Sequence, residues 1–326
     1  MSVYWGKTFF QFFALFFSRI FLIFFQQEPL ASDELQLFVL ILLSVTCAAL
    51  GVFLVVRKMT MIANAVTHTA LLGIMVVVIA GYYLFGSEIA VMSGGAESGI
   101  LLLAALISSI FTMFLVEVLT VKFRLQNDVS IGLVFSFFFA LGIILATIFT
   151  RSTHIGTEVI TGNIDLITAE DVKFSLYLCM TIIFLVGIFY RPLLISSFDS
   201  QFATTSGIKE KAMNYVIVLA TSLTVMVSMQ VVGVVLVLAL LVVPVLTSRL
   251  YFNSLKLILF VSMAIGGVSS LFAVAGSRHL LSVYEAPVST AGLLVAILFL
   301  VWLIFSLGKF LIVALTFQKK ADKVVS

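Results

Sequence analysis

The chain has 326 residues, of which 62% are hydrophobic and only 10% are charged, and its formal net charge is +3. Soluble globular domains are nearer to half apolar and a quarter charged, so this composition excludes an ordinary soluble domain and predicts an all-α, polytopic membrane protein. The basic residues lie in short segments between apolar runs, and the small positive charge therefore does not indicate a nucleic-acid partner.

The apolar runs predict the membrane-spanning helices, because a crossing needs about 20 mainly apolar residues for roughly 30 Å of hydrocarbon. The first candidate, Phe9–Phe25, contains Ser18 and Arg19. The alternatives for this segment are a crossing helix, an interfacial helix and a signal-like segment. No small-residue cleavage site follows it closely, so a signal peptide is the least favoured and we expect a helix that is retained. The clear spans that follow are Leu35–Val56, Ile62–Phe85, Gly99–Val121, Val129–Thr150, Val172–Tyr190, Ala212–Arg249, Leu255–Gly276 and Thr290–Phe317.

The Ala212–Arg249 segment is too long for a single crossing, because a helix of this length would extend about 57 Å. Gln230 and Gly233 mark the predicted break. Gly233 and Pro244 bracket an apolar helix that bends or stops inside the membrane, an arrangement tolerated where a helix lines a cavity or packs against protein. These three residues are candidates for a path or its gate, and ordinary core packing is the alternative.

Loop charges predict the orientation, because Lys and Arg gather on the cytoplasmic side of a membrane. The basic pairs and single residues fall on one side if the spans alternate: Arg57/Lys58, Lys122/Arg124, Arg191, Lys209/Lys211, Arg249/Lys256 and Lys319/Lys320. The opposite loops carry Glu28, Asp33, Glu34, Glu88, Glu97, Glu158, Asp165, Glu170 and Glu285. The pattern requires the Ala212–Arg249 segment to enter the membrane from the cytoplasmic side and return to that same side. It predicts about eight to ten crossings, with both termini in the cytoplasm.

Asn64 and His68 lie four residues apart within an apolar span, so on a helix they project from one face. Polar side chains in hydrocarbon usually face a bundle interior or a watery path. Imidazole binds Zn²⁺, Mn²⁺ and Fe²⁺, and an amide oxygen suits the harder ions, so the pair is a candidate metal site. Such weak coordination suits a permeation path, because the ion must also leave. The alternative is a histidine satisfied by a neighbouring helix. Thr67 and Thr69 either add hydroxyl ligands or bond back to their own helix.

The segment from Phe198 to Gly207 predicts a short amphipathic helix on the cytoplasmic side. Asp199 lies near its start, where a carboxylate interacts favourably with the helix dipole, and Phe198 and Phe202 share one face. The helix either lies on lipid or inserts into a groove on a cytoplasmic partner. The chain has no G-x-x-x-x-G-K-[ST] phosphate loop, so any ATP hydrolysis belongs to another chain, and we do not expect this one to be an enzyme.

Taken in order, these motifs resemble the membrane permease subunit of metal-ion (zinc, manganese or iron) ABC transporters, over about Leu50 to Ser306. The resemblance is carried by Leu50–Met59, Asn64-Ala-Val-Thr-His68, Asn127–Gly132, Phe198–Ala203 with Gly207, Gln230–Gly233 through Pro244, and Ser282–Pro287. It implies an N-terminal apolar extension and outer loop at 1–34, a transmembrane permease domain of ABC importer type at 35–317, and a cytoplasmic tail at 318–326.

The resemblance also implies roles and partners. His68 matches the family's intramembrane histidine, Asn64 stands where many relatives have Asp, and Phe198, Asp199, Phe202, Ala203 and Gly207 match a helix that couples to the ATPase. Pro287-Val-Ser-Thr departs from the Pro-Thr-Gly pattern expected there. The implied partners are cytoplasmic ABC ATPase subunits, a second permease half (a copy or a paralogue) and an extracytoplasmic metal-binding protein. The implied location is the bacterial cytoplasmic (inner) membrane, with a transported divalent metal ion and no permanently bound cofactor.

Four residues on the predicted outer side are secondary candidates for relaying metal or contacting a binding protein: His154, Glu158, His279 and Glu285. Ordinary solvated loop positions are the alternative. Glu117 and Asp128, at cytoplasmic helix ends, are expected to be structural or gate-related. We therefore predict the membrane subunit of an ATP-driven importer for Mn²⁺, Zn²⁺ or Fe²⁺. The alternatives are an ATP-independent transporter or channel for a metal or small solute, a non-transporting scaffold, and an importer of cobalamin or iron–siderophore complexes.

Overall fold

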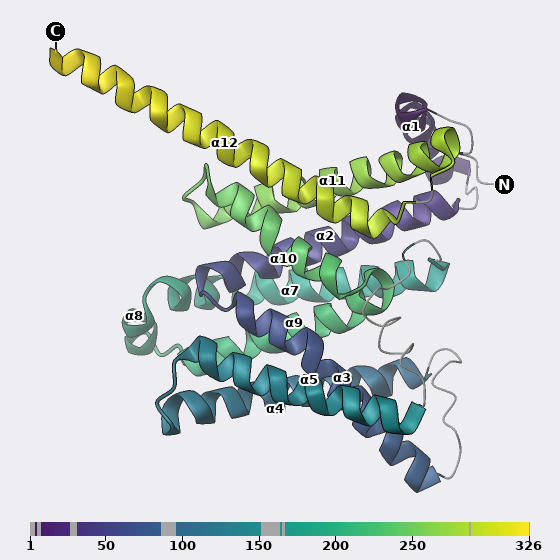
Figure 1. Cartoon of the computed structure of the whole chain (residues 1–326), viewed down its shortest axis with the longest axis vertical. Coiled ribbons are helices and arrows are strands. Elements are labelled where there is room, and N and C mark those ends of the chain that lie inside the picture. The colour runs from purple at the N-terminus through teal and green to yellow at the C-terminus, as the bar shows by residue number, and fades with distance from the viewer. Residues whose placement is uncertain are drawn as a thin grey trace. The chain divides into compact units, whose positions relative to one another are not determined.

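The computed structural model describes residues 4, 8–26, 31–85, 96–150, 164, 167–286 and 288–325. The regular elements in these ranges are helices (Figure 1), and no strand occurs among them. Six of the described helices are long and apolar enough to cross a membrane. The predicted all-α, multi-pass membrane class is therefore confirmed, whereas the number of crossings stays a prediction.

The helices follow the apolar runs of the sequence closely. In chain order they are α1 (Phe9–Gln26), α2 (Ser32–Val56), α3 (Thr60–Phe85), α4 (Ala96–Lys122), α5 (Asn127–Thr150), α7 (Ala169–Phe198), α8 (Ser200–Thr205), α9 (Glu210–Val232), α10 (Val234–Arg249), α11 (Leu255–Tyr284) and α12 (Thr290–Val325). Acidic residues occupy the first turns of α2, α5, α7 and α9, where they interact favourably with the helix dipole. The chain forms two compact units: residues 1–52, 165–172 and 239–326, and residues 53–164 and 173–238.

The first unit is held together by close contacts between small residues. Ser44 of α2 and Ser270 of α11 share a hydrogen bond of 2.8 Å. Gly51 of α2 lies directly against the backbone of Leu241 in α10. Helix α11 also packs against α12 and α1. Small residues let membrane helices approach closely and gain van der Waals contact, which is the main attraction available between helices in lipid.

Buried ion pairs fix the start of α2 in the first unit, which corrects the prediction of an acidic outer loop there. Asp33 and Glu34 are almost completely buried, at 0% and 1% exposure. Asp33 pairs with Arg278 of α11 at 2.7 Å, and Glu34 pairs with Arg19 of α1 at 2.6 Å. The Tyr4 hydroxyl also donates to Glu34 at 2.7 Å. Charges that are buried need such partners, so this cluster joins α1 and α11 to α2.

Helix α3 is central to the second unit, where it packs against α4, α5 and α9. Gly73 of α3 brings the backbone of α4 close, because a Cβ at this position would lie 2.7 Å from the Ala104 carbonyl oxygen. One turn earlier, Ser108 Oγ donates to the Thr69 carbonyl at 2.7 Å. A residue on α3 therefore has protein neighbours on several sides.

Three helices run further than the apolar spans predicted. Helix α7 continues through Arg191 and Pro192 to Phe198, α11 continues to Tyr284, and α12 continues to Val325. Their charged and polar ends lie beyond the predicted spans because hydropathy marks the apolar part of a helix and not its full length. Ser196 Oγ donates to the Pro192 carbonyl at 2.6 Å, so hydrogen bonding to the backbone continues beyond the proline.

The predicted break in Ala212–Arg249 is confirmed at Gly233, which separates α9 from α10. Gly233 has φ 82° and ψ 162°, a conformation that essentially only glycine adopts, and its N–H bonds to the Met229 carbonyl at 3.0 Å. Of the two expectations for the helix bracketed by Gly233 and Pro244, that it bends or that it stops, the second is wrong at Pro244, because α10 continues past this residue to Arg249. The interruption of this long apolar segment therefore comes from glycine alone.

Candidate functional site

Asn64 and His68 lie one turn apart on α3, as the sequence predicts. Both are partly exposed within the second unit. The His68 ring packs against Phe135 and Phe139 of α5, with ring centroids 5.2 and 4.9 Å away, and the two phenylalanines stack on each other. His68 therefore lies where α3 meets α5, with aromatic contacts on one side.

The neighbouring threonines are not aimed outward as additional ligands. Thr67 Oγ1 donates to the Asn64 carbonyl at 2.5 Å, and Thr69 Oγ1 donates to the Val66 carbonyl at 3.4 Å. These bonds back to the helix are the usual way in which a threonine inside an apolar helix satisfies its hydroxyl. Among the described residues, no group of three or more His, Cys, Asp or Glu side chains is placed to hold a metal ion. The imidazole of His68 and the amide of Asn64 are thus the two side chains on this stretch of α3 that stay predicted metal ligands.

The segment predicted as a coupling helix forms α8, a helix of six residues joining α7 to α9. Asp199 is its N-cap, and its carboxylate accepts from the Phe202 N–H at 2.8 Å. Gly207 has φ 80°, which lets the chain turn into α9. Ala203 is fully buried, while Phe202 is 57% exposed. A capped helix with one buried anchor and an exposed aromatic ring is suited to contact with another surface.

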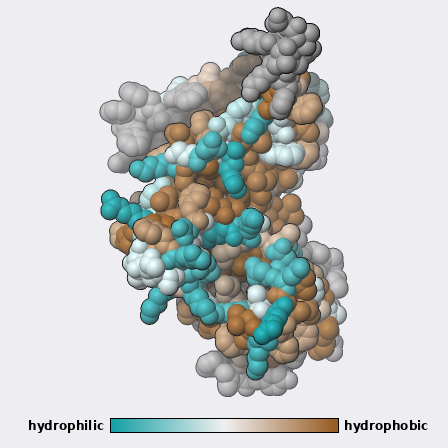
Figure 2. All heavy atoms as spheres, turned by 90° about the vertical axis from the view of Figure 1, so that its left-hand side faces the viewer, coloured by the Kyte–Doolittle hydropathy of each residue, from teal (hydrophilic) through white to brown (hydrophobic). Residues whose placement is uncertain are grey.

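Phe198 does not belong to α8, because it is the last residue of α7. It is nevertheless 67% exposed. The expectation that it shares a helical face with Phe202 is therefore wrong, since the extended Asp199 separates the two helices. Two exposed phenylalanine rings still flank the N-cap, one on each side. Figure 2 looks at the side of the molecule on which α8 lies in Figure 1, and hydrophilic residues gather there in patches between hydrophobic ones.

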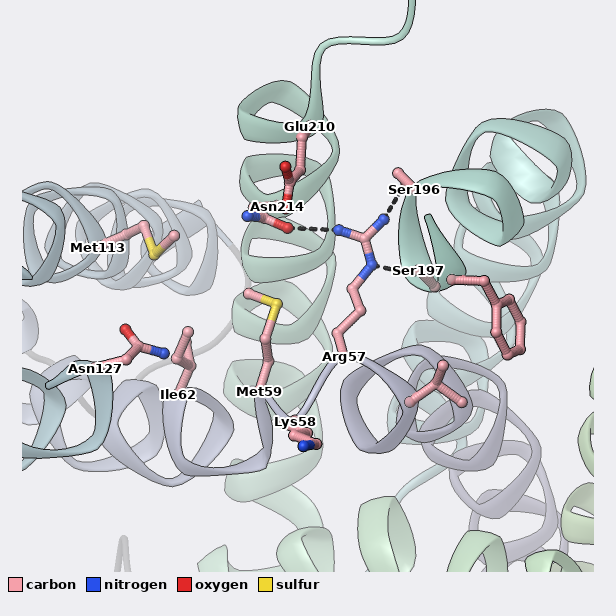
Figure 3. Close-up of a pocket in the computed structure, with 12 residues that line it drawn as sticks. Arg57, Lys58, Met59, Ile62, Met113, Asn127, Ser196, Ser197, Glu210 and Asn214 are labelled. Atoms are coloured by element: carbon pink, nitrogen blue, oxygen red, sulfur yellow. Dashed lines mark hydrogen bonds between the residues drawn. The ribbon is translucent and has the colours of Figure 1, made fainter. Parts of the chain in front are cut away.

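A cavity of about 380 Å³ opens at the same end of the second unit (Figure 3). Its lining comes from the α2–α3 turn, α3, α4, the start of α5, the end of α7 and the start of α9: Val56, Arg57, Lys58, Met59, Ile62, Met113, Asn127, Ser196, Ser197, Phe198, Glu210 and Asn214. The charge pattern predicts that these connections share one side of the membrane. Their meeting around one cavity confirms that they share one end of the unit.

Arg57 is the best connected polar residue at this cavity. Its Nε donates to Ser197 Oγ at 2.9 Å, Nη1 donates to Asn214 Oδ1 at 2.5 Å, and Nη2 donates to Ser196 Oγ. A longer bond of 3.4 Å joins Nη2 to the Leu193 carbonyl. Burial lowers the pKa of Arg57 and Glu210 raises it, but arginine starts so high that the guanidinium stays charged.

Sequence reasoning missed this arrangement, because it treated Arg57 and Lys58 alike as markers of orientation. Lys58 is indeed exposed, with φ 58° in the turn. Glu117, which we expect to be structural or gate-related, ties α4 to α9. Its carboxylate accepts from Lys211 Nζ and, at 2.9 Å, from the Tyr215 hydroxyl. Nothing local in the sequence shows which polar residues meet, because the partners are separated by more than ninety positions.

The remaining candidates are placed apart from these features. Gln230 lies in the last turn of α9, shortly before the break at Gly233. His279 lies within α11 and not in a loop as predicted, and its ring meets Tyr284 edge-on at 5.9 Å. Glu285 is the exposed C-cap of α11 in the left-handed conformation. Asp128 is exposed in the first turn of α5. His154, Glu158 and Pro287 lie outside the described residues.

Comparison with known proteins adds the family context. The family model of the ABC 3 transport family matches residues 35–309. A "Probable metal transport system membrane protein" of Chlamydia pneumoniae is 35% identical over 304 residues, covering 93% of this chain and 91% of that protein. The manganese transport system membrane protein MntC of Listeria monocytogenes is 31% identical over 227 residues, covering 70% of this chain and 75% of MntC.

A solved structure has the same fold. PsaBC from Streptococcus pneumoniae in complex with Fab contains a chain that superposes with a TM-score of 0.67 at 24% identity, covering 83% of this chain and 89% of that chain. At this level of identity the likeness concerns the fold. It confirms the predicted helical architecture.

Proposed function

This chain belongs to the ABC 3 transport family, and on that premise we propose that it is the membrane-spanning subunit of an ATP-driven importer for a divalent transition metal. The candidates are Mn²⁺, Zn²⁺ and Fe²⁺, with Mn²⁺ first. The relatives named above are described as metal and manganese transport proteins, which supports the substrate class. The proposed location is the cytoplasmic membrane of a bacterium.

The observation that carries the proposal is the position of His68 and Asn64 on α3. They lie one turn apart on a helix that packs against three others, α4, α5 and α9. An imidazole nitrogen and an amide oxygen are ligands that a divalent transition metal accepts, and the amide favours the harder ions, among them Mn²⁺. Two neutral donors bind weakly, which suits an ion that must move on.

Helix α8 supports the second part of the proposal, coupling to a separate ATPase. The chain has no phosphate loop of its own. Phe198 at the end of α7 and Phe202 on α8 expose large aromatic surfaces at the predicted cytoplasmic end, and the buried Ala203 anchors α8. Exposed aromatic residues on a rigid support are typical anchors of a protein interface. The proposed partners are cytoplasmic ABC ATPase subunits, a second permease half and an extracytoplasmic metal-binding protein.

The proposed mechanism is alternating access. ATP binding closes the ATPase subunits and displaces α8, and the helices of the permease then reorient the path that passes His68. The chain contributes the path and the coupling contacts and performs no covalent chemistry. Because hydrolysis and transport reside on different chains, transport requires that α8 remain docked throughout the cycle.

The test is metal accumulation by cells that express the chain with its ATPase and binding protein. The wild type should accumulate Mn²⁺ above cells lacking the chain, and elemental analysis measures all candidate metals in one sample. His68→Ala should abolish the accumulation. His68→Phe is the sharper variant, because it keeps an aromatic ring against Phe135 and Phe139 but removes both nitrogen ligands.

Two outcomes separate the metal-ligand role from packing. Loss of accumulation in His68→Phe, at normal membrane yield, supports a ligand role, because aromatic packing is retained. Wild-type accumulation in His68→Phe would reduce His68 to a packing residue. Asn64→Asp adds a carboxylate, a stronger ligand for Mn²⁺, and should accumulate the metal at lower external concentration. His279→Ala tests the secondary outer-side candidate separately, since His279 lies on α11, a different helix.

A further inference from the structure

The side chain of Arg57 joins the two segments that flank α8. Figure 3 shows its guanidinium between the end of α7, which carries Ser196 and Ser197, and the start of α9, which carries Asn214. Helix α7 ends at Phe198 and α9 begins at Glu210, so α8 is the connection between them. One side chain therefore holds both ends of the segment that we propose docks on the ATPase.

The hydrogen bonds between Arg57 and α7 continue through the two serine hydroxyls to the backbone of the preceding turn. Ser197 Oγ donates to the Leu193 carbonyl at 2.5 Å, and Ser196 Oγ donates to the Pro192 carbonyl at 2.6 Å. Each hydroxyl thus accepts from Arg57 and donates to the turn behind it. Proline has no N–H and removes one helical hydrogen bond, which makes α7 easier to bend at Pro192. The last turn of α7, beyond Pro192, is therefore tied to Arg57 through both serine hydroxyls.

The chemistry of arginine suits this position. The guanidinium is a rigid, planar fork with five N–H donors, and here it bonds to acceptors on two helices at once. Its described acceptors are hydroxyl, amide and carbonyl oxygens. Bonds from a cation to neutral oxygens are directional but weaker than a buried ion pair, so they can break and re-form during a cycle. The adjoining cavity of about 380 Å³ leaves room for the side chain to move.

On its other side, Arg57 is tied to the start of α3. Thr60 begins α3 three residues later, and the intervening Met59 is 6% exposed. The Met59 N–H bonds to the Leu54 carbonyl at 2.8 Å, and the Ile62 N–H bonds to the Met59 carbonyl at 3.0 Å. The turn is thus fixed at both ends. A displacement of the Arg57 side chain therefore pulls on the first turn of α3, and Asn64 and His68 follow in its next turns.

We propose that Arg57 is the positioning residue that transmits a displacement of α8 to α3, and so to the stretch that carries Asn64 and His68. The inference rests on the proposed function, because it presumes that α8 docks on an ATPase and that α3 lines the path. It predicts a specific defect. Without the Arg57 fork, α8 still docks and ATP is still hydrolysed, but less of the movement reaches α3.

The experiment compares Arg57→Gln and Arg57→Lys with the wild type in the complete transporter, reconstituted in vesicles with its ATPase subunits and binding protein. Uptake of Mn²⁺ and hydrolysis of ATP are measured on the same vesicles, and the readout is the ratio of the two. In Arg57→Gln this ratio should fall by roughly two- to thirtyfold, the range found for mutations along a coupling network. Arg57→Lys should be intermediate, because it restores the charge without the fork.

Arg191→Gln is the matched control, because Arg191 is an exposed arginine on α7, one residue before Pro192. Its ratio should equal that of the wild type. If Arg57→Gln does not assemble, the double variant Ser196→Ala with Ser197→Ala takes its place, since it removes two acceptors and leaves Arg57 intact. A ratio that falls in the Arg57 or serine variants supports the inference, because a residue with a purely structural role would lower both activities together.

The inference is overturned by an unchanged ratio, whether both activities stay normal or fall together. That result leaves the proposed function intact, provided that the wild-type complex takes up Mn²⁺ in an ATP-dependent manner. Failure of the wild-type complex to take up Mn²⁺, Zn²⁺ or Fe²⁺ would instead refute the proposed function, and the inference with it.

Discussion

Replacing Gly51 by alanine is the most direct test of how the first unit is packed. Gly51 lies on α2, against the backbone of α10. A Cβ at this position would lie 1.9 Å from the Leu241 carbonyl oxygen, 2.9 Å from the Leu241 carbonyl carbon and 3.2 Å from a methyl group of Val245. The two closest atoms belong to the main chain. No change of side-chain rotamer can therefore make room for the added methyl group.

The size of the effect follows from these distances. Cβ atoms essentially never approach other heavy atoms closer than 3.0 Å, so the shortfall from 3.0 to 1.9 Å must be made up by moving α2 and α10 apart. Extra methyl groups in a packed core usually cost about 1–3 kcal/mol, and a main-chain clash belongs at the upper end of that range or above it. For a chain of this length, a cost of about 3 kcal/mol lowers the melting temperature by roughly 4–5 °C.

Thermal unfolding of the detergent-solubilised protein, followed by the loss of the monodisperse species, measures this effect. Gly267→Ala in α11 is the matched control, because a Cβ there has no heavy atom within 4 Å. It should be neutral or slightly stabilising, since alanine favours a helix more than glycine does. Adding Val245→Ala to Gly51→Ala should not restore stability, because the main clash is with the Leu241 backbone. Equal melting temperatures for Gly51→Ala and Gly267→Ala would refute the close approach of α2 and α10.

Three further substitutions test separate parts of the structure. Gly233→Ala should destabilise the α9–α10 connection by about 1–3 kcal/mol, because φ 82° with ψ 162° is strained for alanine, and thermal unfolding would detect the loss. Asp199→Ala should weaken α8 by about 1 kcal/mol and reduce ATPase binding in a pull-down, whereas Asp199→Asn keeps an acceptor for the Phe202 N–H and should bind nearly normally. Glu117→Gln should change the free energy of unfolding by less than about 1 kcal/mol, because Lys211 is largely exposed and solvent screens the ion pair. A much larger loss of stability would contradict this weak role for the pair.

The family relationship and the order of the helices follow from the sequence because they depend on local information. Runs of apolar residues are long enough to mark the long helices, and Gly233 marks a break wherever the surrounding helices lie. The start of α8 also depends on local information, since the Asp199 carboxylate accepts a hydrogen bond from the N–H of Phe202, three residues further along the chain. The resemblance read from motifs between Leu50 and Ser306 is confirmed by a family match over residues 35–309.

The inner faces of the helices, by contrast, are decided only by the tertiary structure. Lipid is as apolar as a protein core, so hydropathy does not distinguish a residue such as Phe184, exposed on α7, from Phe53, buried on α2. For the same reason the sequence could not show that α3 is surrounded by three helices, or that His68 meets two phenylalanines of α5.

The pairing of polar side chains shows most clearly what the sequence determines and what only the tertiary structure decides. The composition of the α2–α3 turn places two positive charges at the predicted cytoplasmic end of the membrane. Nothing in the sequence distinguishes the role of Arg57 from that of Lys58. Helix packing alone brings Ser197 and Asn214, 140 and 157 positions away, to the guanidinium of Arg57 and leaves Lys58 in solvent. A hydrogen bond depends on two side chains meeting within about 3 Å, and that distance is set by how whole helices dock, not by any pattern within one of them.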